Sequence, residues 1–204
     1  EWSGCGEKIF TNCGASESFG KNPEYLRYSA AHSTIILQNT NISEIKVIDN
    51  FFSENIREEI YDLLRYGSNW SFNGGREGRR FWHVNKLEDD IFFNTYLFKI
   101  ICDELDKNFS IGRIYANGQT ANQCGNPHYD DGDITFLYYP NPNWKLEDQG
   151  HLIFLEGDND VSNIVTYKSN RAILFPSGIK HYSDAPHRLF SGLRISLAYK
   201  LLWN

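Results

Sequence analysis

The hydrophobic period of the sequence changes near residue 109, and this change constrains the fold more than any other feature. Before it, apolar residues recur at helical spacing; after it, they alternate in short runs between Gly, Pro, Asn and Asp turns. The runs predict strands at 110–116, 127–130, 133–139, 150–156, 161–167, 171–176, 181–184 and 192–201. Many short strands in one unit predict a mainly β protein with a double-stranded β-helix (jelly-roll) core.

Two amphipathic helices precede these strands and are expected to support one outer face of the roll. A strand at 45–52 leads to Ser53, a candidate N-cap, and the first helix is expected to stop at Gly67. A short strand at 81–84 follows, and Asp89 or Asp90 caps the second helix. The buried faces are predicted to consist of Ile56, Ile60, Leu63 and Leu64 in the first helix and Phe93, Leu97, Ile100, Ile101 and Leu105 in the second.

Length and charge limit the classes of function. The 204 residues suit a single domain, with 44–204 as the folded unit and the Gly-, Ser-, Asn- and Thr-rich segment 1–43 as an N-terminal arm or cover. The net charge of −6 disfavours a nucleic-acid partner bound by charge, because phosphate binding needs clustered cations. No apolar run reaches membrane-spanning length and no signal-peptide pattern begins the chain, so we expect a cytoplasmic protein without membrane contact.

The four cysteines, Cys5, Cys13, Cys102 and Cys124, form no CxxC motif, which argues against a structural zinc site. Free thiols in a reducing compartment are the simplest interpretation, and a pair between Cys5 and Cys13 stays open.

A metal site is predicted around His128 and Asp130. Side chains two apart on an extended strand point to the same face, so this spacing delivers an imidazole and a carboxylate to one point. They are two members of the 2-His-1-carboxylate triad that holds non-haem Fe(II) with open positions, and His181, 51 residues after Asp130, supplies the third. Asp131 is an alternative carboxylate, although its side chain should face the other way, and His187 is an alternative distal ligand.

An anion site is predicted on the last strand, where Arg194 and Ser196 share one face and the other face is apolar. An arginine in such a strand needs an anionic partner, because a buried unpaired charge is strongly unfavourable. A guanidinium beside a hydroxyl suits the bidentate grip of a carboxylate. Arg188 competes for this role but lies in an expected loop.

Taken in order, these motifs resemble the Fe(II)/2-oxoglutarate-dependent oxygenases, within them the prolyl-4-hydroxylase-like branch. The similarity spans roughly residues 45–202. It rests on Ile45–Phe52 entering a helix, Tyr115–Gly118, His128-Tyr129-Asp130, Ile134–Asn141 with Trp144, Gly150–Phe154, His181 and Arg194–Leu197. The sequence departs from the usual pattern at Gly150-His151, where relatives carry Gly-Gly, and in a longer separation between His181 and Arg194.

The resemblance implies a role for each matching residue. His128, Asp130 and His181 match the iron ligands, and Arg194, assisted by Ser196, matches the residue that pairs with the distal carboxylate of 2-oxoglutarate. Tyr139 matches a tyrosine that hydrogen-bonds the same carboxylate, and Tyr115 one near the iron-proximal end of the cosubstrate. Strand parity adds Thr135 to the pocket wall, on the face of Leu137 and Tyr139. The implied cofactors are Fe(II), 2-oxoglutarate as cosubstrate and O2, with ascorbate left open.

The implied activity is hydroxylation of a C–H bond with decarboxylation of 2-oxoglutarate to succinate. Related halogenases replace the ligand carboxylate with a small residue, so Asp130 favours hydroxylation. The substrate is a peptide, prolyl among the options, or a small molecule. The alternatives are an oxidative nucleic-acid demethylase, whose motif ends in a basic residue as Arg194 to Lys200 does, and a non-catalytic jelly-roll binding protein.

The sequence names neither the target nor the oligomeric state. Substrate specificity is expected to lie in the loops 68–85 and 140–149. Arg76, Arg79 and Arg80 belong to the first loop and form either a solvated turn or a substrate lid.

Overall fold

The computed structural model describes residues 2–4, 7–10, 26–28, 35–37, 44–72 and 82–204, with side chains from residue 44 onward. Near the N-terminus, β1 (Trp2–Gly4) pairs with β2 (Glu7–Phe10), and β3 (Leu26–Tyr28) pairs with β4 (Ile35–Leu37), both antiparallel. The possible Cys5–Cys13 pair and the three arginines of the loop 73–80 lie outside the described residues. Cys102 and Cys124 are free thiols. Among the described helices, none is long and apolar enough to span a bilayer.

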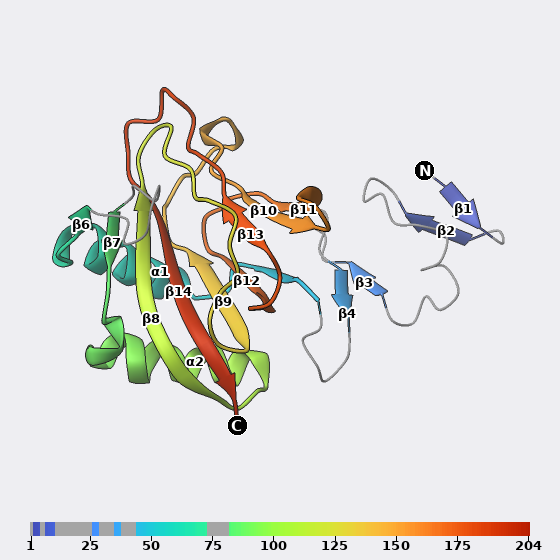
Figure 1. Cartoon of the computed structure of the whole chain (residues 1–204). Coiled ribbons are helices and arrows are strands. Elements are labelled where there is room, and N and C mark those ends of the chain that lie inside the picture. Colours follow the sequence, from blue (N-terminus) through green and yellow to red (C-terminus); the bar gives the residue numbers. More distant parts are fainter. Residues whose placement is uncertain (1, 5–6, 11–25, 29–34, 38–43, 73–81) are drawn as a thin grey trace.

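A seven-stranded antiparallel sheet forms the body of the protein (Figure 1). Its spatial order is β5-β12-β9-β14-β8-β7-β6. The strands are β5 (Lys46–Asp49), β6 (Ser71–Phe72), β7 (Trp82–Val84), β8 (Phe109–Gln119), β9 (Ile134–Tyr139), β12 (Arg171–Pro176) and β14 (Arg194–Trp203). The long strands β8 and β14 lie side by side at its centre, so residues far apart in the sequence share one face.

A second, three-stranded sheet has the order β11-β10-β13. It contains β10 (Leu152–Glu156), β11 (Asp160–Val165) and β13 (His181–Ser183). The prediction of a mainly β protein is confirmed. The predicted strand 127–130 is wrong, because this segment contributes only an isolated bridge between His128 and His181. Pro127 has no N–H to donate, and the chain turns directly after Asp130 through Gly132, whose φ is +84°.

Both predicted helices are present, although each contains a π-helical turn. The first is α1 (Glu54–Asp62), continued by η3 (Leu63–Gly67). The second follows the 3-10 turn η4 (Leu87–Asp89) and consists of η5 (Phe92–Leu97) and α2 (Phe98–Leu105). Another 3-10 turn, η6 (Leu146–Asp148), lies between β9 and β10. Ser53 is the N-cap of α1 without a side-chain capping bond, whereas the Asp90 carboxylate accepts a hydrogen bond of 2.8 Å from the Phe92 amide.

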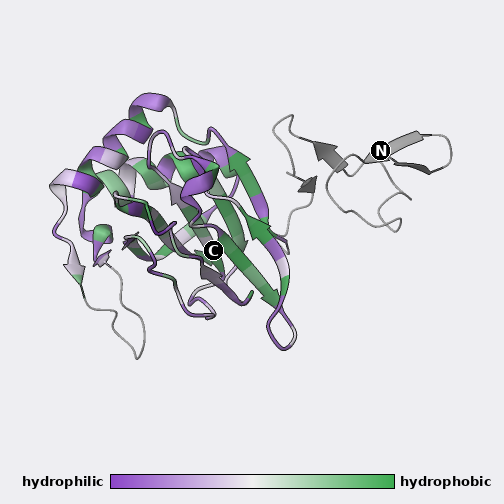
Figure 2. Cartoon of the chain, turned by 90° about the horizontal axis from the view of Figure 1, so that it is seen from above, coloured by the Kyte–Doolittle hydropathy of each residue, from purple (hydrophilic) through white to green (hydrophobic). Residues whose placement is uncertain are grey.

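Each face of the large sheet has its own apolar core. One core packs the helices against the sheet; Ile60, Leu64, Leu97 and Ile101 belong to it. The other core lies on the opposite face and includes Tyr139, Phe154, Tyr167, Ile173 and Phe175. Figure 2 shows that the strands of the sheet are mostly hydrophobic and the loops mostly hydrophilic. Because alternate residues of one strand serve the two cores, odd-numbered β9 residues face away from the helices.

Candidate metal and anion site

Three side chains form a group that could hold a metal ion. One ligand atom from each of His128, Asp130 and His181 lies within 4.8 Å of the others, and the described part of the chain contains no second group of this kind. The His128 Nε2 is 3.5 Å from Asp130 Oδ1, and the His181 Nε2 is 3.3 Å from Asp130 Oδ2. Two imidazole nitrogens and one carboxylate match the donor set of non-haem iron.

Backbone pairing places the two histidines. His128 and His181 exchange both amide hydrogen bonds at 3.0 Å, so their rings stand side by side with centroids 4.6 Å apart. The Nδ1 of His128 lies 2.8 Å from the Asn126 carbonyl oxygen, and the Nδ1 of His181 lies 2.8 Å from that of Ile179. A carbonyl only accepts, so each Nδ1 carries a proton, and each Nε2 is the ring nitrogen that faces Asp130. Nε2 is therefore the atom that each histidine would offer to a metal.

Asp130 is held from several sides. Its amide donates to the Ser177 carbonyl (3.0 Å). Its Oδ2 accepts a hydrogen bond of 2.7 Å from Thr135 and forms an ion pair with Lys200. Burial alone would raise the pKa of this carboxyl, but hydrogen bonds with both histidines and the charge of Lys200 hold the pKa well below its ordinary value. Asp130 is therefore an anion, as a metal ligand must be.

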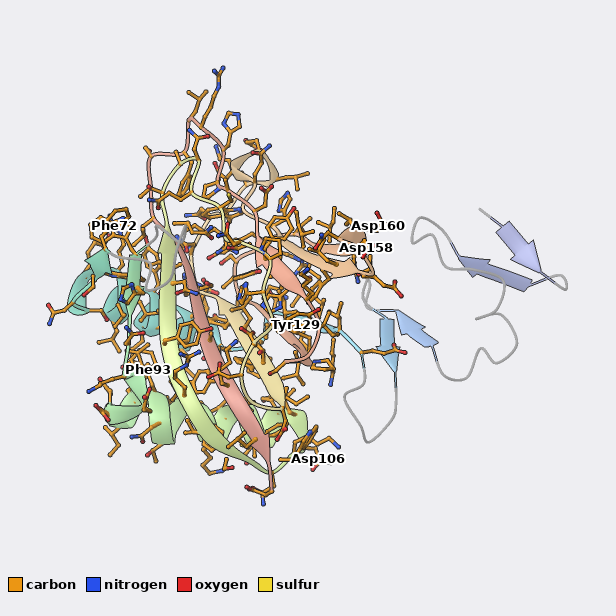
Figure 3. All side chains as sticks on the ribbon, viewed as in Figure 1. Phe72, Phe93, Asp106, Tyr129, Asp158 and Asp160 are labelled. Atoms are coloured by element: carbon orange, nitrogen blue, oxygen red, sulfur yellow. The ribbon has the colours of Figure 1, made fainter. Side chains whose placement is uncertain are left out.

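The residues predicted as alternatives, Asp131, His187 and Arg188, do not belong to this group of three ligands. The Asp131 side chain is 64% exposed and pairs with Arg113 at 2.8 Å. Tyr129, between the two predicted ligands, is also 64% exposed (Figure 3). His187 is outside the group of ligand atoms, and Arg188 is exposed in the loop before β14.

Arg194 is only 1% exposed, and its guanidinium is partly paired. Its Nε donates to the Gly150 carbonyl at 2.7 Å, and its Nη1 donates to Gln119 Oε1 at 2.8 Å. Its Nη2 has no hydrogen-bond partner although it is buried. The guanidinium carbon lies 4.8 Å from the Tyr167 ring centre and 5.2 Å from that of Tyr139.

Tyr139 supplies a second unpaired group beside this cation. Its side chain is fully buried, and its hydroxyl has no partner. Burial raises the pKa of this hydroxyl, so it is a neutral donor. The Tyr139 hydroxyl and the Arg194 Nη2 are the two buried side-chain polar atoms without partners among the described residues. Two such donors, one of them charged, are what a carboxylate would satisfy.

The other predicted residues divide between the two ends of the site. Ser196 is 4% exposed and lies two residues beyond Arg194 on β14. Thr135 is bonded to Asp130, so it lies at the metal end. Tyr115, opposite Ala198 in the sheet, also lies at this end, with its ring centre 5.5 Å from Lys200 Nζ.

Two buried residues, Gln119 and Lys200, were not predicted. Strand parity could have found Lys200, whereas the position of Gln119 depends on the register between two strands. Lys200 has the parity of Arg194 and Ser196 in an otherwise apolar strand, and Gln119 lies opposite Arg194 on β8. At Gly150-His151, the structure explains why the first residue is glycine. Gly150 has φ +71°, and a Cβ there would lie 2.8 Å from Arg194 Cδ. The His151 Nδ1 accepts a hydrogen bond of 3.3 Å from the Tyr167 amide.

Comparison with known proteins gives a likeness in structure only. No family model and no curated protein sequence matches the chain. HygX from Streptomyces hygroscopicus, solved with nickel and 2-oxoglutarate, has a TM-score of 0.60 at 12% identity, covering 78% of this chain and 82% of that one. A Pseudomonas putida prolyl-4-hydroxylase has a TM-score of 0.55 at 15% identity, covering 78% and 92%.

A prolyl hydroxylase from Trichoplax adhaerens, in complex with a peptide fragment of the hypoxia inducible factor oxygen degradation domain, gives a TM-score of 0.55 at 18% identity, covering 77% and 82%. The described chain therefore has the jelly-roll fold of these proteins.

Proposed function

We propose that this chain is an Fe(II)- and 2-oxoglutarate-dependent dioxygenase that hydroxylates a C–H bond of a peptidyl or small-molecule substrate. One observation carries the proposal. A histidine-carboxylate-histidine group and a buried, half-paired arginine occur together in the fold of the 2-oxoglutarate oxygenases. A metal site alone would suit many reactions, whereas a metal site next to a carboxylate site is what a chelating keto acid requires.

The residues present fit the metal. His128 and His181 would bind through Nε2, because Nδ1 of each is occupied by a backbone carbonyl. Asp130 would bind through Oδ1, because Oδ2 already accepts from Thr135 and Lys200. Three protein ligands leave the open positions that a substrate-activating iron site needs.

The residues also fit 2-oxoglutarate. The unpaired Arg194 Nη2 and Tyr139 hydroxyl would donate to its distal carboxylate, and Ser196 lies on the same strand face. Gln119 and the Gly150 carbonyl hold the guanidinium so that its free edge is fixed. The burial of Arg194 excludes water, which strengthens the pairing of the two charges.

When bound, iron and 2-oxoglutarate supply the oxidising chemistry, with succinate and CO2 formed as one oxygen atom of O2 enters the substrate C–H bond. The chain positions the reactants. The two histidines and Asp130 would fix the metal, Arg194 and Tyr139 would orient the cosubstrate, and the apolar residues Phe154 and Phe175 pack beside the His181 ring.

Two of the similar structures contain bound molecules that inform the substrate class. One HygX structure holds hygromycin B, and the Trichoplax adhaerens enzyme holds a peptide fragment. A peptidyl and a small-molecule substrate are therefore both retained for this chain. Mass spectrometry of candidate substrates, with an increase of about 16 Da as the readout, separates these classes.

Succinate formation tests the reaction class. Purified protein should convert 2-oxoglutarate to succinate in an Fe(II)-dependent manner, and the His128→Ala variant should lose this turnover. His187→Ala is the matched control, because His187 lies outside the metal-ligand group, and it should keep the activity. If the folded wild-type protein forms no succinate with any substrate tested, the proposal is wrong.

A further inference from the structure

Lys200 is a buried cation to which the proposed reaction assigns no role. It is 2% exposed in the interior of β14. Its ammonium forms an ion pair with Asp130 Oδ2 and donates to Thr135 Oγ1 at 3.1 Å. The Tyr115 ring centre lies 5.5 Å from the ammonium nitrogen. Two of its three N–H donors therefore have partners within the protein. Unlike the Arg194 Nη2, the Lys200 ammonium is already paired within the protein.

The backbone fixes this pairing. β14 pairs with β9 so that Lys200 lies opposite Thr135. The turn after Asp130 packs onto the same place, because the Asp133 amide donates to the Leu201 carbonyl at 2.9 Å. At Gly132 an added Cβ would lie 3.1 Å from that carbonyl oxygen. The carboxylate and the ammonium are therefore held together by the sheet and the turn, independently of any metal.

The two carboxylate oxygens of Asp130 have different contacts. Oδ2 accepts from Lys200 and Thr135 and lies 3.3 Å from the His181 Nε2, whereas Oδ1 has only the His128 Nε2 beside it, at 3.5 Å. A divalent cation between the histidines would share this carboxylate with the ammonium. Two cations on one buried carboxylate repel each other, and burial reduces the screening between them. Conversely, a buried carboxylate that has lost its only neighbouring cation is strongly unfavourable.

We propose that Lys200 is the internal counter-ion of the candidate metal site. It neutralises Asp130 when the metal is absent, keeps Oδ2 out of the coordination shell, and holds the affinity for a divalent metal below what the three ligands alone would give. Lys200 is in this sense a positioning residue, and its role rests on the proposed metal site. The sign of its effect is distinctive, since losing a residue that only orients Asp130 would weaken metal binding.

Nickel titration of the full chain tests this inference. Ni(II) is a redox-stable probe, and calorimetry on the metal-free protein gives its Kd. Lys200→Met should bind Ni(II) at least tenfold more tightly than the wild type. Lys200→Arg, which keeps the charge, should stay within about threefold of the wild type; tenfold corresponds to about 1.4 kcal/mol. Lys200→Gln, also neutral but still a donor, should shift in the direction of Lys200→Met and replaces it if that variant does not fold.

Arg171→Met is the matched control away from the site. Arg171 is a buried cation paired with Asp49 at 2.6 Å, so its loss should lower the Tm of the metal-free and nickel-loaded protein equally and leave the Kd unchanged. Lys200→Met should lower the Tm of the metal-free protein by roughly 10 °C and that of the loaded protein by clearly less.

The two proposals fail differently. If wild-type nickel binding does not depend on His128, the metal site itself is wrong, and the role of Lys200 falls with it. If that dependence holds but neutral Lys200 variants bind Ni(II) equally or more weakly than the wild type, only the counter-ion role is overturned.

Discussion

Tyr139→Phe should have opposite effects on the empty and the liganded protein. The Tyr139 hydroxyl is buried without a hydrogen-bond partner. Leaving such a group unpaired costs about 1–3 kcal/mol, so its removal should stabilise the ligand-free protein by a similar amount. For a chain of this length the Tm should rise by roughly 5 °C.

When 2-oxoglutarate is bound, Tyr139→Phe should be unfavourable instead of stabilising. If the hydroxyl donates to the distal carboxylate of 2-oxoglutarate, the variant loses a hydrogen bond to a charged group, worth about 1.5–3 kcal/mol. The Kd for 2-oxoglutarate should therefore rise roughly 10- to 100-fold. Calorimetry on nickel-loaded protein without O2 measures this affinity in the absence of turnover, and thermal unfolding measures the stability.

Tyr138→Phe is the control, because the adjacent tyrosine is equally buried but faces the other core. Its hydroxyl donates to Asn170 Oδ1 at 2.8 Å, so this variant should lose about 1 kcal/mol of stability and keep the affinity for 2-oxoglutarate. A Tyr139→Phe variant that is less stable than the wild type and binds 2-oxoglutarate normally would refute the reasoning.

Three further predictions concern other parts of the chain. Gly150→Ala should lower both Tm and 2-oxoglutarate affinity, because φ is +71° and the new Cβ would lie 2.8 Å from Arg194 Cδ; calorimetry showing unchanged affinity would contradict this. Burial raises the pKa of Asp49, but its cationic partners Arg171 and Lys168 lower it, so that the pKa stays below the ordinary 3.8. The stability that ionised Asp49 contributes is present above that value and is lost as the pH falls through the folded-state pKa. Asp49→Asn should therefore flatten the acid loss of stability in unfolding titrations from pH 5 to 2. Asp130→Asn should abolish Ni(II) binding and Asp131→Asn should leave it unchanged, so equal losses in a titration would reject the assignment of the carboxylate ligand.

Local patterns predicted the secondary structure well, because alternation and helical spacing are properties of neighbouring residues. The run 171–176 is β12, and the first helical segment ends at Gly67 as expected. The segment 127–130 failed for a non-local reason. Whether a short extended run becomes a strand depends on a partner with free backbone groups, and within this segment only His128 forms a β-bridge.

The sequence also supplied the members of the candidate site but not their contacts. Strand parity placed Arg194 and Ser196 on one face, and the HxD spacing brought His128 and Asp130 together. Strand parity carries no information about the register between strands, so it could not predict the pairing of Arg194 with Gln119. The role of each predicted residue toward iron and 2-oxoglutarate stays a prediction for the experiments above.

By itself the sequence determined which side chains are available and which strand face each occupies, because both follow from residue type and a period of two. Tertiary structure decided which of those side chains contact one another and which stay unpaired. In the large sheet, β14 lies between β8 and β9. This arrangement pairs Lys200 with Asp130 and leaves the Arg194 Nη2 and the Tyr139 hydroxyl without partners. These outcomes depend on contacts between segments about 60 to 75 residues apart, for which no local pattern carries information.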